Sequence, residues 1–301
     1  MMSVISADRL TKSYGKSRGI INLDLDVCEG EFFGFIGPNG AGKSTTIRTL
    51  LGLIYPTSGR AEIFGKDIVK QKKEILADIG YMPSEAFFYG GMRVRDVIAL
   101  SAKLRKADCG KEAESLCERL GLDTAKRVDE LSLGNRKKVS VVCALQHKPK
   151  LCILDEPTSG LDPLIQKEFF DILKERHSEG ATIFLSSHIL SEIQKNCSRA
   201  AIIKDGRLIA LDSVENLSKT SAKRVTLHGV KTVPAELGAR NAESTGDSVS
   251  FLYSGDIKLL LSIAQKLPIY DMTVAEPGLD EIFMHYYESD NRANVKDGEK
   301  A

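Results

Sequence analysis

The 301-residue sequence contains no tryptophan, and only 6% of its residues are aromatic. It also lacks any apolar run approaching the roughly 18 residues that indicate a membrane-spanning helix. The N-terminus, MMSVISADRLTKSYG, has no basic segment followed by an apolar stretch, so we expect no secretory signal. These absences predict a protein that stays in the cytoplasm, where it is made.

An excess of one charge is lacking as well. The chain has 42 Lys and Arg against 41 Asp and Glu, which gives a net charge of +1. A generally basic surface is therefore not expected, and we predict no nucleic-acid partner. With 42% apolar and 28% charged residues, the composition is typical of a globular protein. The length allows one large domain with a small companion.

The six cysteines form no C-x-x-C pair, and several lie inside apolar segments. Their arrangement therefore predicts neither a zinc site nor a disulfide framework, but reduced thiols in a cytosolic protein.

Short apolar runs predict buried strands. The runs are EFFGFIG (31–37), LCILD (151–155) and TIFLSS (182–187). Apolar spacing of helical type begins after Thr45 and recurs over 163–180, and Asp205-Gly206 predicts a hairpin turn within 200–211. Strands that alternate with helices imply an α/β fold with a mainly parallel sheet covered on both faces.

Two changes of pattern divide the chain. Between about 85 and 140 helical patterns replace strands, which predicts a helical insertion into the α/β core. After about 217 short strands return, with helical patterns at 257–267 and 278–288. We therefore expect a main domain over 1–217, a small α+β accessory domain over 218–290 and a disordered tail over 291–301.

The segment GPNGAGKS fits the phosphate-binding motif G-x-x-x-x-G-K-[ST] at every fixed position, and it lies between a predicted strand and a predicted helix. Its glycines let backbone N–H groups surround phosphates without Cβ clashes. Lys43 is expected to reach the β- and γ-phosphates of ATP, and the Ser44 hydroxyl to bind Mg²⁺. The nucleotide contacts expected here are Gly37, Asn39, Gly40, Gly42, Lys43, Ser44 and Thr45.

Two carboxylates end the predicted strand CILDE. Because an unpaired buried carboxylate is costly, we expect them to face a cation or a polar site. Asp155 is positioned to hold Mg²⁺, and Glu156 can act as the general base on an attacking water. The alternative is a strand-end carboxylate that caps the next loop.

These motifs and their order resemble the ATP-binding subunits of ABC transporters over about residues 3 to 215. Walker A (37–44) is followed by a signature-like LSLGN (131–135), Walker B (151–156) and an SGLD segment (159–162) similar to the D-loop. The resemblance implies a P-loop NTPase core of ABC type. The C-terminal part is similar to the domain appended to bacterial exporter ATPases.

The resemblance implies that two such nucleotide-binding domains, in a homodimer or a heterodimer, meet head to tail, so that each ATP lies between the P-loop of one and the signature of the other. Ser132 and the N–H of Gly134 would then contact the γ-phosphate held by a second subunit, at the positive end of the following helix. The alternative is an ordinary helix N-cap by Ser132 or Asn135.

Three further residues take their expected roles from the same resemblance. His188 is similar to the switch histidine that contacts the γ-phosphate, Tyr14 to the aromatic that stacks on adenine, and Asp162 to the D-loop aspartate. By pattern alone, a lone histidine or a tyrosine before glycine is more often structural.

The sequence departs from the family pattern at two places. In the signature, Leu133 and Asn135 stand where Gly and Gln are common. In GYMPSEAFFYG, Ser84 stands where the family has a Gln that touches Mg²⁺ and the attacking water. A water held by Ser84, or else the carboxylate of Glu85, is the expected substitute.

The resemblance implies an ATP-driven motor that closes as a dimer and moves a separate membrane-spanning permease, in an exporter, while resting on the inner face of the cell membrane. Phe87, Phe88 and Tyr89 are either core residues of the helical insertion or the site where this permease docks. Two alternatives stay open: a non-transport ABC ATPase, and a weakly hydrolysing regulatory half of a heterodimer.

Overall fold

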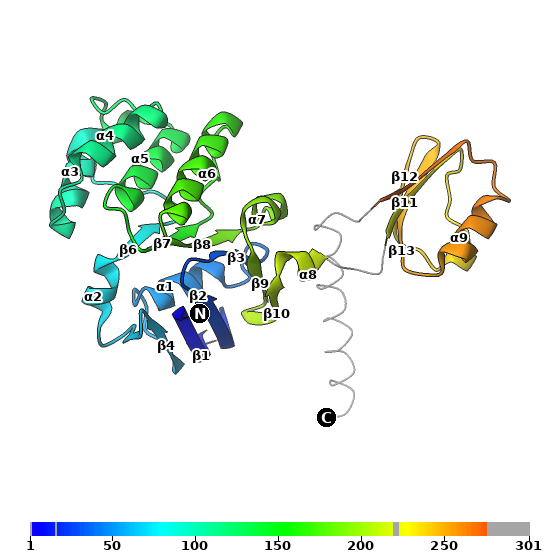
Figure 1. Cartoon of the computed structure of the whole chain (residues 1–301), viewed down its shortest axis with the longest axis horizontal. Coiled ribbons are helices and arrows are strands. Elements are labelled where there is room, and N and C mark those ends of the chain that lie inside the picture. The colour runs from blue at the N-terminus through cyan, green and yellow to red at the C-terminus, as the bar shows by residue number, and fades with distance from the viewer. Residues whose placement is uncertain (1, 16, 219–222, 276–301) are drawn as a thin grey trace. The chain divides into compact units, whose positions relative to one another are not determined.

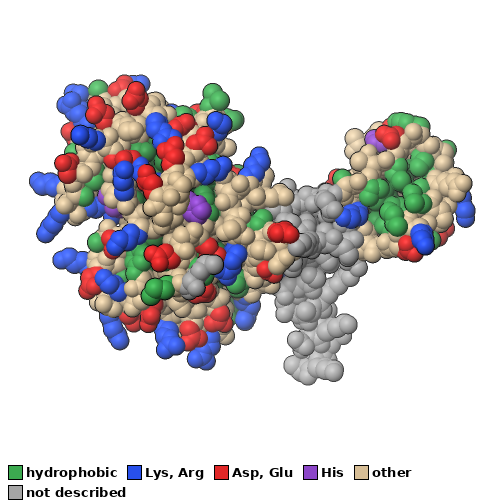
Figure 2. Space-filling view, viewed as in Figure 1, with side chains coloured by type: hydrophobic (Ala, Val, Ile, Leu, Met, Phe, Trp, Pro, Cys, Tyr) green, Lys and Arg blue, Asp and Glu red, His purple; other side chains and the backbone are tan. Residues whose placement is uncertain are grey.

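The computed structural model describes residues 2–15, 17–218 and 223–275 (Figure 1 and Figure 2). The chain divides into two compact units, residues 1–214 and 215–301, and each is described by itself. The helix expected over 278–288 and the tail expected over 291–301 lie outside the described residues. Among those described, no helix has the length and apolar character needed to cross a membrane.

The first unit is built on a six-stranded sheet in the order β10-β9-β3-β8-β7-β6. All neighbouring pairs from β9 to β6 are parallel, and β10 pairs with β9 in the antiparallel sense, which confirms the mainly parallel sheet. Every residue of β3, β7 and β8 is buried, as their apolar runs predict. The strands are β3 (Phe32–Ile36), β6 (Ile79–Met82), β7 (Leu151–Asp155), β8 (Thr182–Ser187), β9 (Arg199–Lys204) and β10 (Arg207–Ser213).

Helices cover this sheet because each turns an apolar stripe toward it. Contacts join α1 to β7, α6 to β8, and α7 to β3. The Asp162 carboxylate accepts the first N–H groups of α6, and Pro163 is its first residue, so the helix begins where a cap and a proline favour it. These helices are α1 (Lys43–Leu50), α2 (Lys72–Ala77), α6 (Pro163–Ser178) and α7 (Leu190–Asn196).

A second sheet, which the sequence analysis did not predict, packs beside the first in the order β2-β1-β4-β5. Its signal is nevertheless present: Leu23, Leu25 and Val27 are buried and alternate with exposed Asp24 and Asp26. The strands are β1 (Ser3–Tyr14), β2 (Ser17–Cys28), β4 (Ser58–Ile63) and β5 (Lys66–Asp67).

Three helices fill the interval between β6 and β7 and lie together in Figure 1. They are α3 (Val94–Arg105), α4 (Gly110–Arg119) and α5 (Leu133–Leu145), with a 3₁₀ turn at Val128–Glu130. Helix α5 contacts α3, α4 and β6. Arg119 of α4 binds Glu168 at 2.6 Å and Glu175 at 2.5 Å, both on α6, which ties this helical group to the α/β core.

The second unit contains an antiparallel sheet in the order β12-β13-β11-β14 and two described α-helices, α9 and α8 (Val214–Ser218), the latter beginning at the last residue of the first unit. Val225, Phe251 and Leu260 are fully buried and belong to its core. Strand β12 was not predicted from the sequence. The elements are β11 (Lys223–His228), a 3₁₀ turn (Ala235–Leu237), β12 (Arg240–Thr245), β13 (Ser248–Tyr253), α9 (Ile257–Ala264) and β14 (Asp271–Ala275).

Candidate nucleotide site

The loop over residues 37–42 leaves the carboxyl end of β3 and enters α1 at Lys43. Ligands bind at this edge of parallel sheets, where loops gather outside the strand ends. The N-cap residue of α1 is Gly42, with φ at 111°, a backbone angle that disfavours other residues. No side chain among the described residues caps this helix, so its first N–H groups are available to an anion.

Lys43, Glu156 and His188 form one connected group beside this loop. Lys43 Nζ lies 3.0 Å from Glu156 Oε1, and His188 Nδ1 lies 3.0 Å from Glu156 Oε2. Lys43 also donates to the carbonyl oxygens of Gly37 at 2.5 Å and Pro38 at 3.2 Å. The lysine of the P-loop and the carboxylate after β7 are therefore brought together although 113 positions separate 43 from 156.

Glu156 is held in an unusual state. Its φ is 48°, in the left-handed region, a strain that concentrates at functional sites. Burial raises the pKa of its carboxyl, but the hydrogen bond and charge of Lys43, together with His188, outweigh burial and lower that pKa below its ordinary value. The carboxylate is therefore ionised at neutral pH and can accept a proton.

Asp155 is fully buried at the end of β7. Its Oδ1 accepts a hydrogen bond from Ser186 Oγ at 3.0 Å, while Oδ2 has no hydrogen-bond partner among the described residues. A buried carboxylate oxygen without a partner is costly, and a bound cation would satisfy it. This arrangement fits an oxygen-liganded divalent cation such as Mg²⁺.

Lys137 is a residue of this site that the sequence analysis missed. It lies on α5, is 1% exposed, and donates from Nζ to the Glu156 carbonyl oxygen at 2.9 Å. Burial lowers the pKa of Lys137, while the charges of Asp155, Glu156 and Glu85 act in the opposite direction. It links α5 to the strained residue, and no spacing in the sequence indicates this contact.

A cavity of about 500 Å³ opens over the P-loop. Its walls include Ser84 from the loop after β6 and Glu156 from the loop after β7, whereas the exposed Glu85 does not line it. Gly19 also lines the cavity, and the sequence analysis did not predict it. The predicted residues that line the cavity are Asn39, Gly40, Gly42, Lys43, Ser44, Thr45, Ser84 and Glu156.

Several predicted residues lie away from the cavity walls. Tyr14 is 46% exposed at the end of β1, with the Lys12 ammonium 5.3 Å from its ring centroid. Gly37 is the first residue of the loop and lies against β9, where an added Cβ would be 2.5 Å from the Ile203 carbonyl oxygen. His188 reaches the site through Glu156.

The signature-like segment contacts the SGLD segment rather than the cavity. Ser132 is the exposed N-cap of α5 and accepts from Asn135 N–H at 3.4 Å. A Cβ on Gly134 would be 2.7 Å from the Gly160 carbonyl oxygen, so the two backbones touch there. Asp162 caps α6 through the N–H groups of Leu164 and Ile165. Both segments present helix N-termini.

Sequence comparison identifies relatives over nearly the whole chain. The sequence model of the ABC transporter family matches residues 20–159. The chain is 36% identical to the bacitracin transport ATP-binding protein BcrA of Bacillus licheniformis, over 95% of this chain and 86% of the relative. It is 31% identical to the uncharacterized ABC transporter ATP-binding protein YhaQ of Bacillus subtilis, over 93% of this chain and 97% of the relative.

Solved structures have the same fold as the first unit's core. An ATP-binding subunit of an ABC transporter matches with a TM-score of 0.67 and 29% identity, over 71% of this chain and 91% of that one. The dimeric post-hydrolysis ATP-binding cassette MJ0796 bound to ADP and Pi matches with a TM-score of 0.62 and 23% identity, over 70% and 98%.

Proposed function

Because the chain belongs to the ABC transporter family, as its ATP-binding and ATP-hydrolysing subunit, we propose that it drives a separate permease that exports an antibiotic or similar compound. Two similar proteins support this cargo class by name: the bacitracin transport protein and the probable multidrug ABC transporter protein YbhF of Escherichia coli, which is 34% identical over 73% of this chain. Such a subunit works in the cytoplasm, attached to the membrane through its permease.

The connected group of Lys43, Glu156 and His188 carries the proposal for hydrolysis. The β- and γ-phosphate oxygens of ATP replace Glu156 as the anionic partner of Lys43. Glu156, released from Lys43, loses the contact that most lowers its pKa and becomes a stronger base, which accepts a proton from the water that attacks the γ-phosphorus. His188 orients this carboxylate through Nδ1 and turns its other ring nitrogen to the γ-phosphate.

Mg²⁺ would be held by the Ser44 hydroxyl and the Asp155 carboxylate, and it would neutralise charge on the β- and γ-phosphates. The unpartnered Oδ2 of Asp155 supports this position. Ser84, which lines the cavity, takes the place of the family's Gln through a bridging water. Glu85 is the weaker candidate because it is exposed and does not line the cavity.

A second copy of the chain completes the site. ATP-binding cassettes of this family act as dimers with transmembrane partners, and we propose that Ser132 and the Gly134 N–H contact the γ-phosphate held by the facing copy. The exposed Ser132 at the N-terminus of α5 supports this role, since free N–H groups and the helix dipole both favour an anion there. Tyr14, exposed at the end of β1, would stack on the adenine.

The permease would dock in a groove of about 620 Å³ between α2 and α3. Phe87, Tyr89 and Leu104 line this groove, and each is more than three-quarters exposed, at 82%, 78% and 76%. Exposed aromatic side chains around an apolar groove fit the apolar face of a partner helix. Of the two roles predicted for the aromatic run, docking is the one these exposures favour.

Steady-state ATP hydrolysis by the purified chain tests the assignment of Glu156. Glu156→Gln removes the proton acceptor but keeps the shape of the side chain, so turnover should fall by about 100-fold or more while ATP still binds. Glu29→Gln is the matched control, because it neutralises an exposed carboxylate outside the cavity and should leave turnover near the parent rate. Comparable turnover in Glu156→Gln and the parent would exclude Glu156 as the base.

A further inference from the structure

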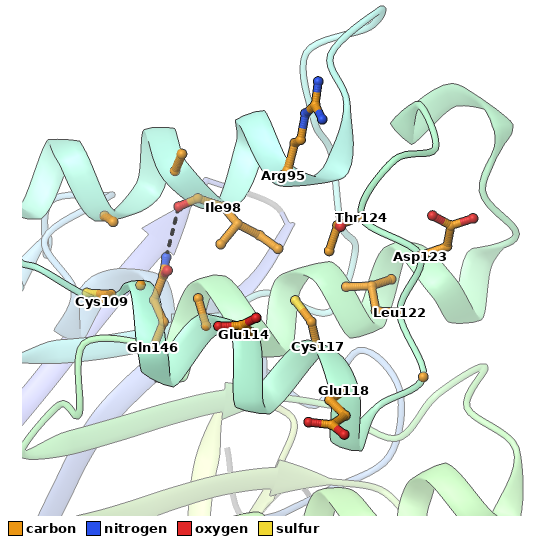
Figure 3. A pocket seen from close by; sticks show the side chains of 15 residues that line it. Arg95, Ile98, Cys109, Glu114, Cys117, Glu118, Leu122, Asp123, Thr124 and Gln146 are labelled. Carbon is orange, nitrogen blue, oxygen red and sulfur yellow. Dashed lines mark hydrogen bonds between the residues drawn. The ribbon is translucent and has the colours of Figure 1, made fainter.

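The helical group contains a pocket of about 850 Å³ between α3 and α4 (Figure 3). Ligand pockets in proteins have volumes of about 300–1,000 Å³. The pocket exists because the two helices face each other with small residues, which leave the space between them unfilled: Ala99, Ala102, Gly110 and Ala113. None of its lining residues belongs to the cavity over the P-loop.

A buried polar side chain lies in its wall. Gln146, next to the C-terminal end of α5, is 2% exposed, and its Nε2 donates to the Ile98 carbonyl oxygen at 3.1 Å, as Figure 3 shows. The amide oxygen, Oε1, has no hydrogen-bond partner among the described residues. An unpartnered buried acceptor costs free energy, so it favours a ligand that brings an N–H or O–H donor.

Acidic side chains of α4 and of the loop after it line the pocket. Glu114, Glu118 and Asp123 line the pocket and are exposed, against one cation, Arg95, which lies 3.7 Å from Asp96. The residues that line this pocket thus include three carboxylates and one cation, although the whole chain is nearly neutral. This local excess favours a positively charged ligand and disfavours an anion such as a nucleotide.

We propose that this pocket binds a small organic ammonium ion with an apolar body. Ile98, Cys117 and Leu122, all buried, provide apolar surface for the body. The ammonium N–H groups supply the donor that Gln146 Oε1 lacks, and the carboxylates that line the pocket balance the charge. The site is separate from the nucleotide cavity, so it does not depend on the proposed function.

Ligand-observed NMR titration of the full chain with hexylammonium tests the proposal. Binding should be saturable and should be lost in Ala102→Leu, because the added methyl groups enter the pocket from a half-buried position. Hexanoate has the same body with the opposite charge and should not bind. Equal binding of both ions, or binding of hexylammonium that survives Ala102→Leu, would overturn the proposal.

A second pair of probes tests the two polar features without relying on that variant. Trimethylhexylammonium keeps the charge but has no N–H donor, so it should bind at least about ten-fold more weakly than hexylammonium if Gln146 Oε1 is used. Glu114→Gln with Glu118→Gln should weaken hexylammonium about two- to five-fold, whereas the control Glu29→Gln should not. Equal affinities for the two cations, or no effect of the double variant, would contradict the assigned chemistry. Unchanged thermal unfolding midpoints confirm that the variants fold.

Discussion

Lys43 is 5% exposed, and the oxygens of Gly37, Pro38 and Glu156 surround its ammonium group. A buried cation of this kind needs anionic or carbonyl partners, because desolvation penalises its charge. Phosphate oxygens are stronger partners than carbonyls for such a group. A phosphate oxygen of ATP can therefore replace one of the oxygen partners of Lys43 while the P-loop keeps its position.

We expect Lys43→Ala to weaken ATP binding by at least about ten-fold, because it removes a charge-assisted hydrogen bond to the phosphates. Titration calorimetry measures this change. Lys70→Ala, which removes an exposed cation outside the cavity, should bind ATP like the parent. Identical affinities for the Lys43→Ala variant and the parent would remove Lys43 from the site.

His147 gives the chain a pH dependence that is separate from catalysis. Burial and the nearby Arg105 lower the pKa of His147 from 6.5 to about 4, while its hydrogen bond to the Ile79 carbonyl opposes the shift. The unfolded chain therefore binds more protons between these values, and stability is full above pH 6.5 and falls as the pH decreases toward 4.

Replacing His147 with Gln should remove this loss, which amounts to about 1–2 kcal/mol between pH 7 and 5. Urea unfolding of the parent and of His147→Gln at the two pH values measures it. If the free energy of unfolding of the parent changed no more between the two pH values than that of His147→Gln, the pKa of His147 would not be lowered in the folded chain.

At the scale of single residues, the sequence predicts which residues form the candidate site better than it predicts how they contact one another. The P-loop motif predicts that Lys43 and Ser44 belong to the site, and the acidic end of β7 predicts Asp155 and Glu156, because both motifs depend on local spacing. The positive φ of Glu156 and its link to Lys137 come from packing between α5 and the strand end, which no local pattern encodes.

Among the elements, α5 has a structural role at its first turn and, in our proposal, a functional role there as well. Ser132, an exposed residue, caps the helix by accepting a hydrogen bond from the Asn135 N–H at 3.4 Å. A helix cap alone would tolerate any good capping residue, whereas a phosphate contact would not tolerate a negative charge.

Ser132→Asp separates these roles. Aspartate caps as well as serine, so stability should stay within about 0.5 kcal/mol of the parent. Its charge would repel a facing phosphate, so ATP turnover should fall by about ten-fold or more. Ser132→Ala is the control, and it should lose about 1 kcal/mol of stability through the missing cap. If Ser132→Asp hydrolysed ATP at the parent rate, Ser132 would act as a helix cap and not as a phosphate contact.

Elements with continuous apolar runs or clear caps are the ones that the sequence predicts correctly, as β3, β7, β8 and α6 show. The β1–β2 pair was missed because register shifts and additional polar residues interrupt the alternation of apolar and polar positions along the two strands. Strand β12 is short and polar, and its pairing with β13 rather than its own sequence defines it.

At the scale of the whole molecule, we expect the permease to bind in the groove that Tyr89 and Leu104 line. Tyr89→Glu places a charge in this groove at a 78% exposed position, so folding and basal ATP hydrolysis should be unaffected. Recovery of the chain with membranes should fall several-fold. Tyr55→Glu, at a 69% exposed tyrosine outside the groove, is the matched control. Equal membrane recovery of the two variants would move the docking site elsewhere.

The central claim is that a second copy completes the ATP site, and the molar mass of Glu156→Gln in ATP tests it most directly. Light scattering should give 33.0 kDa without ATP and about twice that mass with ATP, because binding persists while hydrolysis stops. Adding Ser132→Arg should keep the mass at 33.0 kDa in ATP with unchanged ATP affinity, since the signature would act only on the facing copy. A Glu156→Gln variant that binds ATP but stays monomeric, or a Ser132→Arg change that weakens ATP binding by the monomer, would contradict the account.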